Sequence, residues 1–100
     1  MDSTQRRETT LDLAKVAVVT DRLQEYGEPE DNFLDTAELW NGYLRSLYGD
    51  TAPLLNALDI ANLMILLKMA RLKTSPKKLD HYVDMAGYAA CGASAAQAEA

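Results

Sequence analysis

Apolar residues recur every three to four positions along most of this chain, which is the spacing of one face of an α-helix. The chain has three prolines, five glycines and few β-branched residues, a composition that also favours helix over sheet. Four segments carry the helical pattern, and short connectors separate them. We therefore predict an all-α fold, a compact four-helix bundle.

The first predicted helix begins at Thr9 or Thr10, because either hydroxyl can accept a hydrogen bond from a free backbone N–H at the helix start. It ends before Gly27, and Pro29 prevents its continuation. Its apolar stripe comprises Leu13, Val16, Ala17, Thr20, Leu23 and Tyr26.

The second predicted helix is capped by Asp31 or Asn32 and stops at Gly49. Its apolar stripe comprises Phe33, Ala37, Trp40, Tyr43, Leu44 and Leu47. Trp40 and Tyr43 of this stripe are expected in the core or at an interface. A proline in the connector that follows predicts a short helical segment over residues 53–56.

The third predicted helix covers about residues 58–73, with Asn56 as its cap or Asp59 supporting its first turn. The fourth follows Ser75 as cap and Pro76 as first helical residue, and it fades through an alanine-rich tail. Almost every side chain of the third helix is apolar: Leu58, Ile60, Ala61, Leu63, Met64, Ile65, Leu66, Leu67, Met69, Ala70 and Leu72. A helix that is apolar nearly all round belongs at the centre of a fold.

The length of 100 residues suits a single domain, residues 1–100, with one core. We expect the ordered core at about 9–93, with frayed ends at 1–8 and 94–100. Three neighbouring helices leave part of the apolar third helix uncovered. Small residues on the fourth helix allow close helix approach, and together these features predict a homo-oligomer.

The net charge of −5 makes nucleic acid an unfavourable partner, because binders of nucleic acid carry a basic face. Residues 73–78 form one local basic patch. The apolar run 60–67 is well short of the roughly 20 residues that span a bilayer, so no membrane partner is expected. The single cysteine, Cys91, has alanine and glycine neighbours and is expected to be a packed small residue.

Opposite charges face each other across the connection between the third and fourth helices. Lys68 and Arg71 close the third helix, and Asp80 and Asp84 lie one turn apart at the start of the fourth. Charges on helices this apolar either pair inside the fold or face a charged ligand. We expect Lys68 or Arg71 to lie within ion-pairing distance of Asp80 or Asp84.

If a ligand is bound, Lys68 and Arg71 are the candidate phosphate contacts. The carboxylates of Glu38, Asp80 and Asp84 are then candidate ligands for magnesium. The supporting residues are Tyr26, Asn32 and Tyr88. His81 has no partners at metal-ligand spacing and is expected at the surface or in an ion pair.

Several blocks of sequence resemble a family of small phage and prophage proteins known as a domain of unknown function. The blocks are Tyr26-Gly27 with Asn32-Phe33, Ala37-Glu38-Leu39-Trp40, Leu67-Lys68-Met69-Ala70-Arg71-Leu72 and Asp80-x-x-x-Asp84-x-Ala86-Gly87-Tyr88-Ala89-Ala90. The similarity covers roughly residues 21–92. It implies a compact helical domain in a phage genome, and hence the cytoplasm of a host bacterial cell, but no established activity.

The chain also resembles, more distantly, the nucleotide-modification-associated domain and the MazG-like all-α nucleoside triphosphate pyrophosphohydrolases. That group holds its metal with Glu-x-x-Glu and Glu-x-x-Asp on adjacent helices. The nearest matches here are Asp35-x-x-Glu38 and Asp80-x-x-x-Asp84, of which the second has a different spacing and follows an intervening helix.

Two functions are therefore open. The first is a phage-encoded protein that binds a nucleotide or similar phosphate ligand, as a degenerate pyrophosphohydrolase-like domain. The second is a non-enzymatic helical interaction protein, of the host-takeover or counter-defence type, in which Lys68–Asp84 and Arg71–Asp80 are internal ion pairs. Buried, mutually paired charges favour the second function, and unpaired donors lining an open cleft favour the first.

Overall fold

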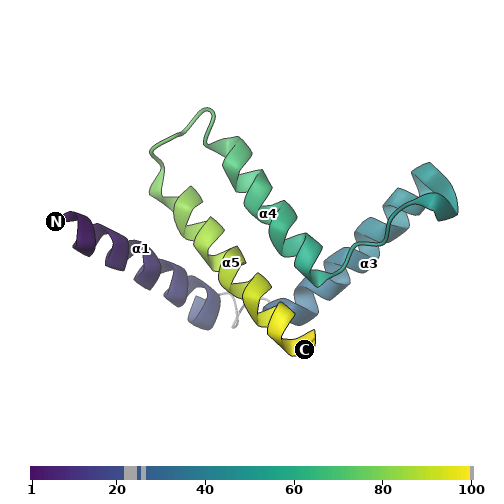
Figure 1. Ribbon diagram of the computed structural model, residues 1–100, viewed down its shortest axis with the longest axis horizontal. Coiled ribbons are helices and arrows are strands. Elements are labelled where there is room, and N and C mark those ends of the chain that lie inside the picture. The colour runs from purple at the N-terminus through teal and green to yellow at the C-terminus, as the bar shows by residue number, and fades with distance from the viewer. Residues whose placement is uncertain (22–24, 26, 100) are drawn as a thin grey trace.

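The computed structural model describes residues 1–21, 25 and 27–99. Their elements are, in order, α1 (Ser3–Val16), the π-helical turn η1 (Ala17–Asp21), α3 (Pro29–Tyr48), the 3₁₀ turn η2 (Gly49–Thr51), α4 (Ala57–Arg71) and α5 (Leu79–Glu99). Within these ranges there is no strand, so the predicted all-α class with four long helices is confirmed (Figure 1). No helix in the described part of the chain is long and apolar enough to cross a membrane.

Helix α1 begins at Ser3, and the predicted start at Thr9 or Thr10 is wrong. The cause is a capping box formed by Asp2 and Gln5: the Gln5 N–H donates to the Asp2 carboxylate at 2.8 Å, and the Asp2 N–H donates to Gln5 Oε1 at 2.9 Å. This pair satisfies two of the N–H groups that a helix start leaves free. The helix therefore includes most of the segment 1–8 that was predicted to be frayed.

Helix α3 also begins earlier than predicted, with Pro29 in its first turn and Glu28 as its cap. Proline suits that position because its fixed φ is already helical and the first turn needs no N–H from it. The predicted cap at Asp31 or Asn32 is therefore wrong. The predicted stop is confirmed: Gly49 follows the last residue with φ 68°, a conformation that costs glycine little.

Helix α4 is capped as predicted, with the Asp59 N–H donating to Asn56 Oδ1 and the Asn56 N–H donating to the Asp59 carboxylate, both at 2.9 Å. The predicted helical segment over 53–56 is absent: these residues have no regular secondary structure, and the short 3₁₀ turn lies earlier. The predicted start of α5 at Pro76 is wrong by three residues. A tight turn occupies residues 75–78 and is closed by the Lys78 N–H on the Ser75 carbonyl at 3.2 Å.

Helix α5 is the element that α1, η1, α3 and α4 all contact, whereas α4 contacts α5 and α3 (Figure 1). The central position predicted for the third helix therefore belongs to the fourth. Two glycines explain this: a Cβ on Gly87 would lie 2.9 Å from Val18 Cγ1, and one on Gly92 would lie 3.2 Å from Ala61 Cβ. Helices can approach α5 closely on two sides because these positions carry no side chain.

The core is small and lies where the first half of α3 and the beginning of α4 meet α5. Its buried members are Phe33, Ala37, Ile60, Ala61, Tyr88 and Cys91. The burial predicted for Cys91 is confirmed. The rings of Phe33 and Tyr88 pack with centroids 6.1 Å apart, so one aromatic pair joins α3 to α5.

Two arms project from this core, the first half of α1 and the second half of α3 (Figure 1). The radius of gyration is 15.4 Å, and the molecule measures 52 × 31 × 25 Å. A compact domain of this length has a radius of gyration of about 13 Å. The α3 arm is held by the connector beside it, because the Asn41 amide donates to the Leu55 carbonyl at 3.0 Å and accepts from the Leu55 N–H at 2.8 Å.

Candidate functional site

An ion pair joins the end of α4 to the beginning of α5. Lys68 Nζ lies 2.8 Å from Asp84 Oδ2, and the two side chains are 13% and 32% exposed. The predicted pairing of a cation of the third helix with a carboxylate of the fourth is thereby confirmed. The ammonium of Lys68 is mostly removed from water, so the Asp84 carboxylate supplies the hydrogen bond that water would otherwise give.

The second predicted pair is not formed: within the described residues there is no ion pair between Arg71 and Asp80. Both residues are exposed. Asp80 lies in the first turn of α5 and Arg71 in the last turn of α4, where the helix dipole favours each charge. Arg71 is thus an available cation at the α4–α5 turn, next to three exposed lysines: Lys73, Lys77 and Lys78.

The carboxylates of Glu38, Asp80 and Asp84 are not brought together. Glu38 is exposed on α3, whereas Asp84 of α5 is bound to Lys68 of α4. Among the residues that the structure describes, no three His, Cys, Asp or Glu side chains gather closely enough to hold a metal ion.

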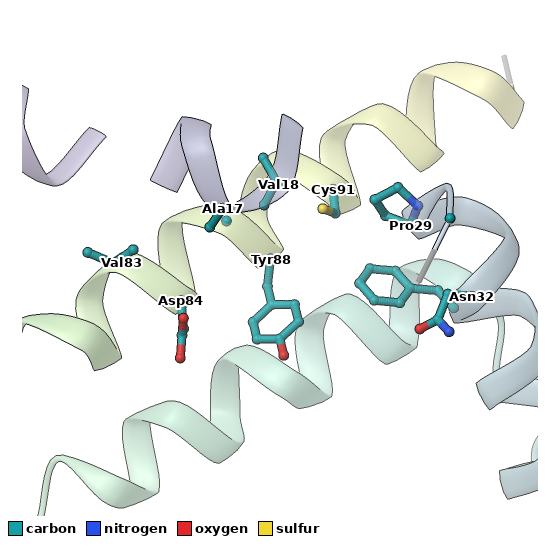
Figure 2. A pocket seen from close by; sticks show the side chains of 11 residues that line it. Ala17, Val18, Pro29, Asn32, Val83, Asp84, Tyr88 and Cys91 are labelled. Atoms are coloured by element: carbon teal, nitrogen blue, oxygen red, sulfur yellow. The ribbon is translucent and has the colours of Figure 1, made fainter. Parts of the chain in front are cut away.

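A cavity beside the core does unite three of the predicted residues. Asn32, Asp84 and Tyr88 line it, together with apolar side chains from η1, α3 and α5 (Figure 2). Its volume of about 30 Å³ gives room for roughly two water molecules, since one water needs about 10–15 Å³. Tyr26, the other supporting residue, lies outside the described residues. The cavity is therefore mainly apolar, with three polar residues in its lining, and it has no room for a nucleotide.

His81 is buried, and its predicted place at the surface is wrong. It precedes Asp84 by three positions and therefore shares the face of α5 that meets α4. Its Nδ1 atom has no hydrogen-bond partner within the described part of the chain. The sequence signal for this burial is only the helical spacing from Asp84.

The largest apolar feature of the α3 arm is a row of exposed side chains, which we call the α3 stripe and define as Leu39, Trp40, Tyr43 and Leu47. Leu39, Tyr43 and Leu47 follow at intervals of four residues and are 76%, 66% and 55% exposed. Trp40 flanks them and is partly exposed. Trp40 and Tyr43 were predicted to lie in the core or at an interface, and the core packs only the earlier turns of α3.

Comparison with known proteins gives consistent matches. The model of the family described as "Domain of unknown function (DUF6378)" matches residues 9–96. The chain is 42% identical over 84 residues to the Gene 55 protein of Mycobacterium phage D29, and 40% identical over 68 residues to the Gene 55 protein of Mycobacterium phage L5. These matches confirm the predicted similarity to an uncharacterised family with phage-encoded members.

The matches cover 84% and 68% of this chain but only 51% and 40% of the two phage proteins. The chain thus spans about half the length, or less, of the phage relatives that it matches. No solved structure matches it. Residues 39–47, which contain the α3 stripe, lie inside the region that the family model matches.

Proposed function

We propose that this chain, which belongs to the family described as "Domain of unknown function (DUF6378)", is a non-enzymatic helical protein that acts by binding another protein through the α3 stripe. The observation that carries the proposal is the stripe itself. It places two leucines, a tryptophan and a tyrosine on an arm that the core does not cover. Tryptophan and tyrosine are the residue types that most often dominate protein–protein binding energy.

The arrangement of charges supports the same function. Lys68, whose side chain is 13% exposed, is bound to Asp84, so its ammonium is already occupied. The cavity beside Asp84 is too small for a nucleotide. A largely buried lysine with a carboxylate partner is what a structural role requires, because Asp84 offsets the cost of removing the ammonium from water.

A photo-crosslinking amino acid placed at residue 43 tests this function in bacterial cells that express the protein. We expect protein adducts from position 43 and far fewer from position 45, because Arg45 is exposed two residues away on the opposite side of α3. The two positions share the same helix, so the comparison controls for expression and for random collisions. Equal labelling from both positions, or none from either, would contradict the proposed function.

A second candidate function is the binding of a phosphate ligand such as a nucleotide, in the manner of a degenerate pyrophosphohydrolase-like domain. What favours it is the exposed guanidinium of Arg71 beside Lys73, Lys77 and Lys78 at the α4–α5 turn. If this turn binds phosphate, nucleoside triphosphates should raise the melting temperature, and Arg71→Gln should remove that increase. A melting temperature unaffected by nucleotides, with or without magnesium, would reject this candidate.

A further inference from the structure

The chain exposes more surface than a folded monomer of its size. Its solvent-accessible surface is 7054 Å² for a mass of 11.0 kDa. Monomeric proteins of this mass expose about 5,600 Å², so the excess is roughly 1,400 Å². Obligate homodimers bury roughly 1,000–2,500 Å² on each partner. The excess therefore matches the area that one chain gives to a stable dimer.

The excess surface has an apolar region suited to such an interface. The four side chains of the α3 stripe carry no charge, although the chain as a whole has a net charge of −5. Two copies can therefore bring their stripes together without placing like charges in direct opposition. Contact between them would also remove water from leucine and aromatic side chains that are now 38% to 76% exposed.

The stripe is also complementary to itself. Leu39 and Leu47 lie four residues on either side of Tyr43, so these three side chains have the same order in both directions along the helix, whereas Trp40 has Ser46 at its symmetric position. A two-fold axis that crosses α3 at Tyr43 would place Leu39 of each copy against Leu47 of the other. In an isologous interface residue i of one copy contacts residue j of the other and the reverse, as Leu39 and Leu47 would do here.

We propose that the partner bound by the α3 stripe is a second copy of this chain, joined as an antiparallel α3–α3 pair centred on Tyr43. This inference rests on the proposed function and specifies its partner. It also relocates the interface that the sequence suggested. The glycines of α5 are used within the chain, against Val18 and Ala61, and are not available to a second copy.

Sedimentation equilibrium of the purified full chain tests the dimer. The wild type should have twice the mass of 11.0 kDa. Tyr43→Lys and Leu47→Lys should each raise the dissociation constant of the dimer at least ~30-fold. At moderate protein concentration both variants should therefore have the mass of the monomer. Leu66→Lys is the matched control, because Leu66 is 57% exposed on α4 and Leu47 is 55% exposed. This control should remain dimeric.

A second measurement, disulfide crosslinking, detects the dimer directly and needs no variant that dissociates it. Under mild oxidation, Tyr43→Cys should form a disulfide-linked dimer, because the two thiols would meet at the two-fold axis. Leu66→Cys should not. The native Cys91 is buried and is common to both variants, so it does not bias the comparison. Circular dichroism should show the same helix content for every variant.

A wild-type mass of 11.0 kDa at the highest soluble concentration would overturn the inference. So would dissociation by Leu66→Lys equal to or stronger than that by Tyr43→Lys. Either result would leave the proposed function possible. In that case position 43 should crosslink in cells to a protein other than a second copy of this chain, and the adduct should have a correspondingly different mass. If position 43 gives no adduct in cells, the proposed function fails as well.

Discussion

Ile60→Ala should lower the free energy of unfolding by about 2–5 kcal/mol, which is the usual cost of truncating a fully buried isoleucine. Ile60 is 1% exposed and is the largest fully buried side chain among the described residues. It lies in the first turns of α4, where α4 packs against α3 and α5. The core is small, so neighbouring side chains have little freedom to refill the space.

Thermal unfolding measures this effect directly. In a domain of this length, each 1 kcal/mol corresponds to a shift of roughly 4–8 °C in the melting temperature. Leu66→Ala is the matched control on the same helix, because Leu66 is exposed and its truncation should cost about 0.5 kcal/mol or less. Both variants must be compared at one protein concentration, since dimer formation adds stability. A loss for Ile60→Ala no larger than that for Leu66→Ala would contradict the assigned core.

Asp84→Ala should lower the free energy of unfolding by about 1.5–3 kcal/mol, the range for a hydrogen bond to a charged group. The substitution leaves the ammonium of Lys68 without a partner at a site where its side chain is only 13% exposed. Lys68→Met should cost less, about 1 kcal/mol or below, because Asp84 is 32% exposed and water can solvate its carboxylate. The two partners of one ion pair are thus expected to differ.

Chemical denaturation of the two single variants and the double variant separates these contributions. Adding Lys68→Met to Asp84→Ala should recover part of the lost stability, because it removes the unpaired cation. Magnesium should not change any of these differences if the pair is structural. A stability loss that appears only with magnesium and a nucleotide would instead assign Asp84 to a ligand site.

The features that were predicted correctly depend either on residues close together in sequence or on the attraction between opposite charges. The Asn56–Asp59 capping box and the stop at Gly49 need only local hydrogen bonds and one permissive φ. The pairing of Lys68 with Asp84 follows from opposite charges on two consecutive apolar helices. The early start of α1 was missed because Asp2 and Gln5 cap it before Thr9 can.

The features that were missed depend on contacts between distant segments. Helical spacing shows that a face is apolar, but it does not show which apolar residues the other helices cover. Trp40, Tyr43 and Phe33 all belong to the apolar face of α3, yet only Phe33 is buried. The central role of α5 likewise depends on Gly87 and Gly92 meeting side chains from other helices. Neither the exposure of Trp40 and Tyr43 nor the central role of α5 follows from the spacing of apolar residues along the sequence.

Fluorescence of Trp40 provides the most direct test that the α3 stripe is an interface. Trp40 is the only tryptophan in the chain, and it lies on the stripe. Contact between the stripes of two copies should remove water from the indole. Dilution separates the copies, so the emission of the wild type should then shift to longer wavelength. Tyr43→Lys should emit at long wavelength at every concentration. Identical spectra for wild type and Tyr43→Lys at all concentrations would contradict the assignment.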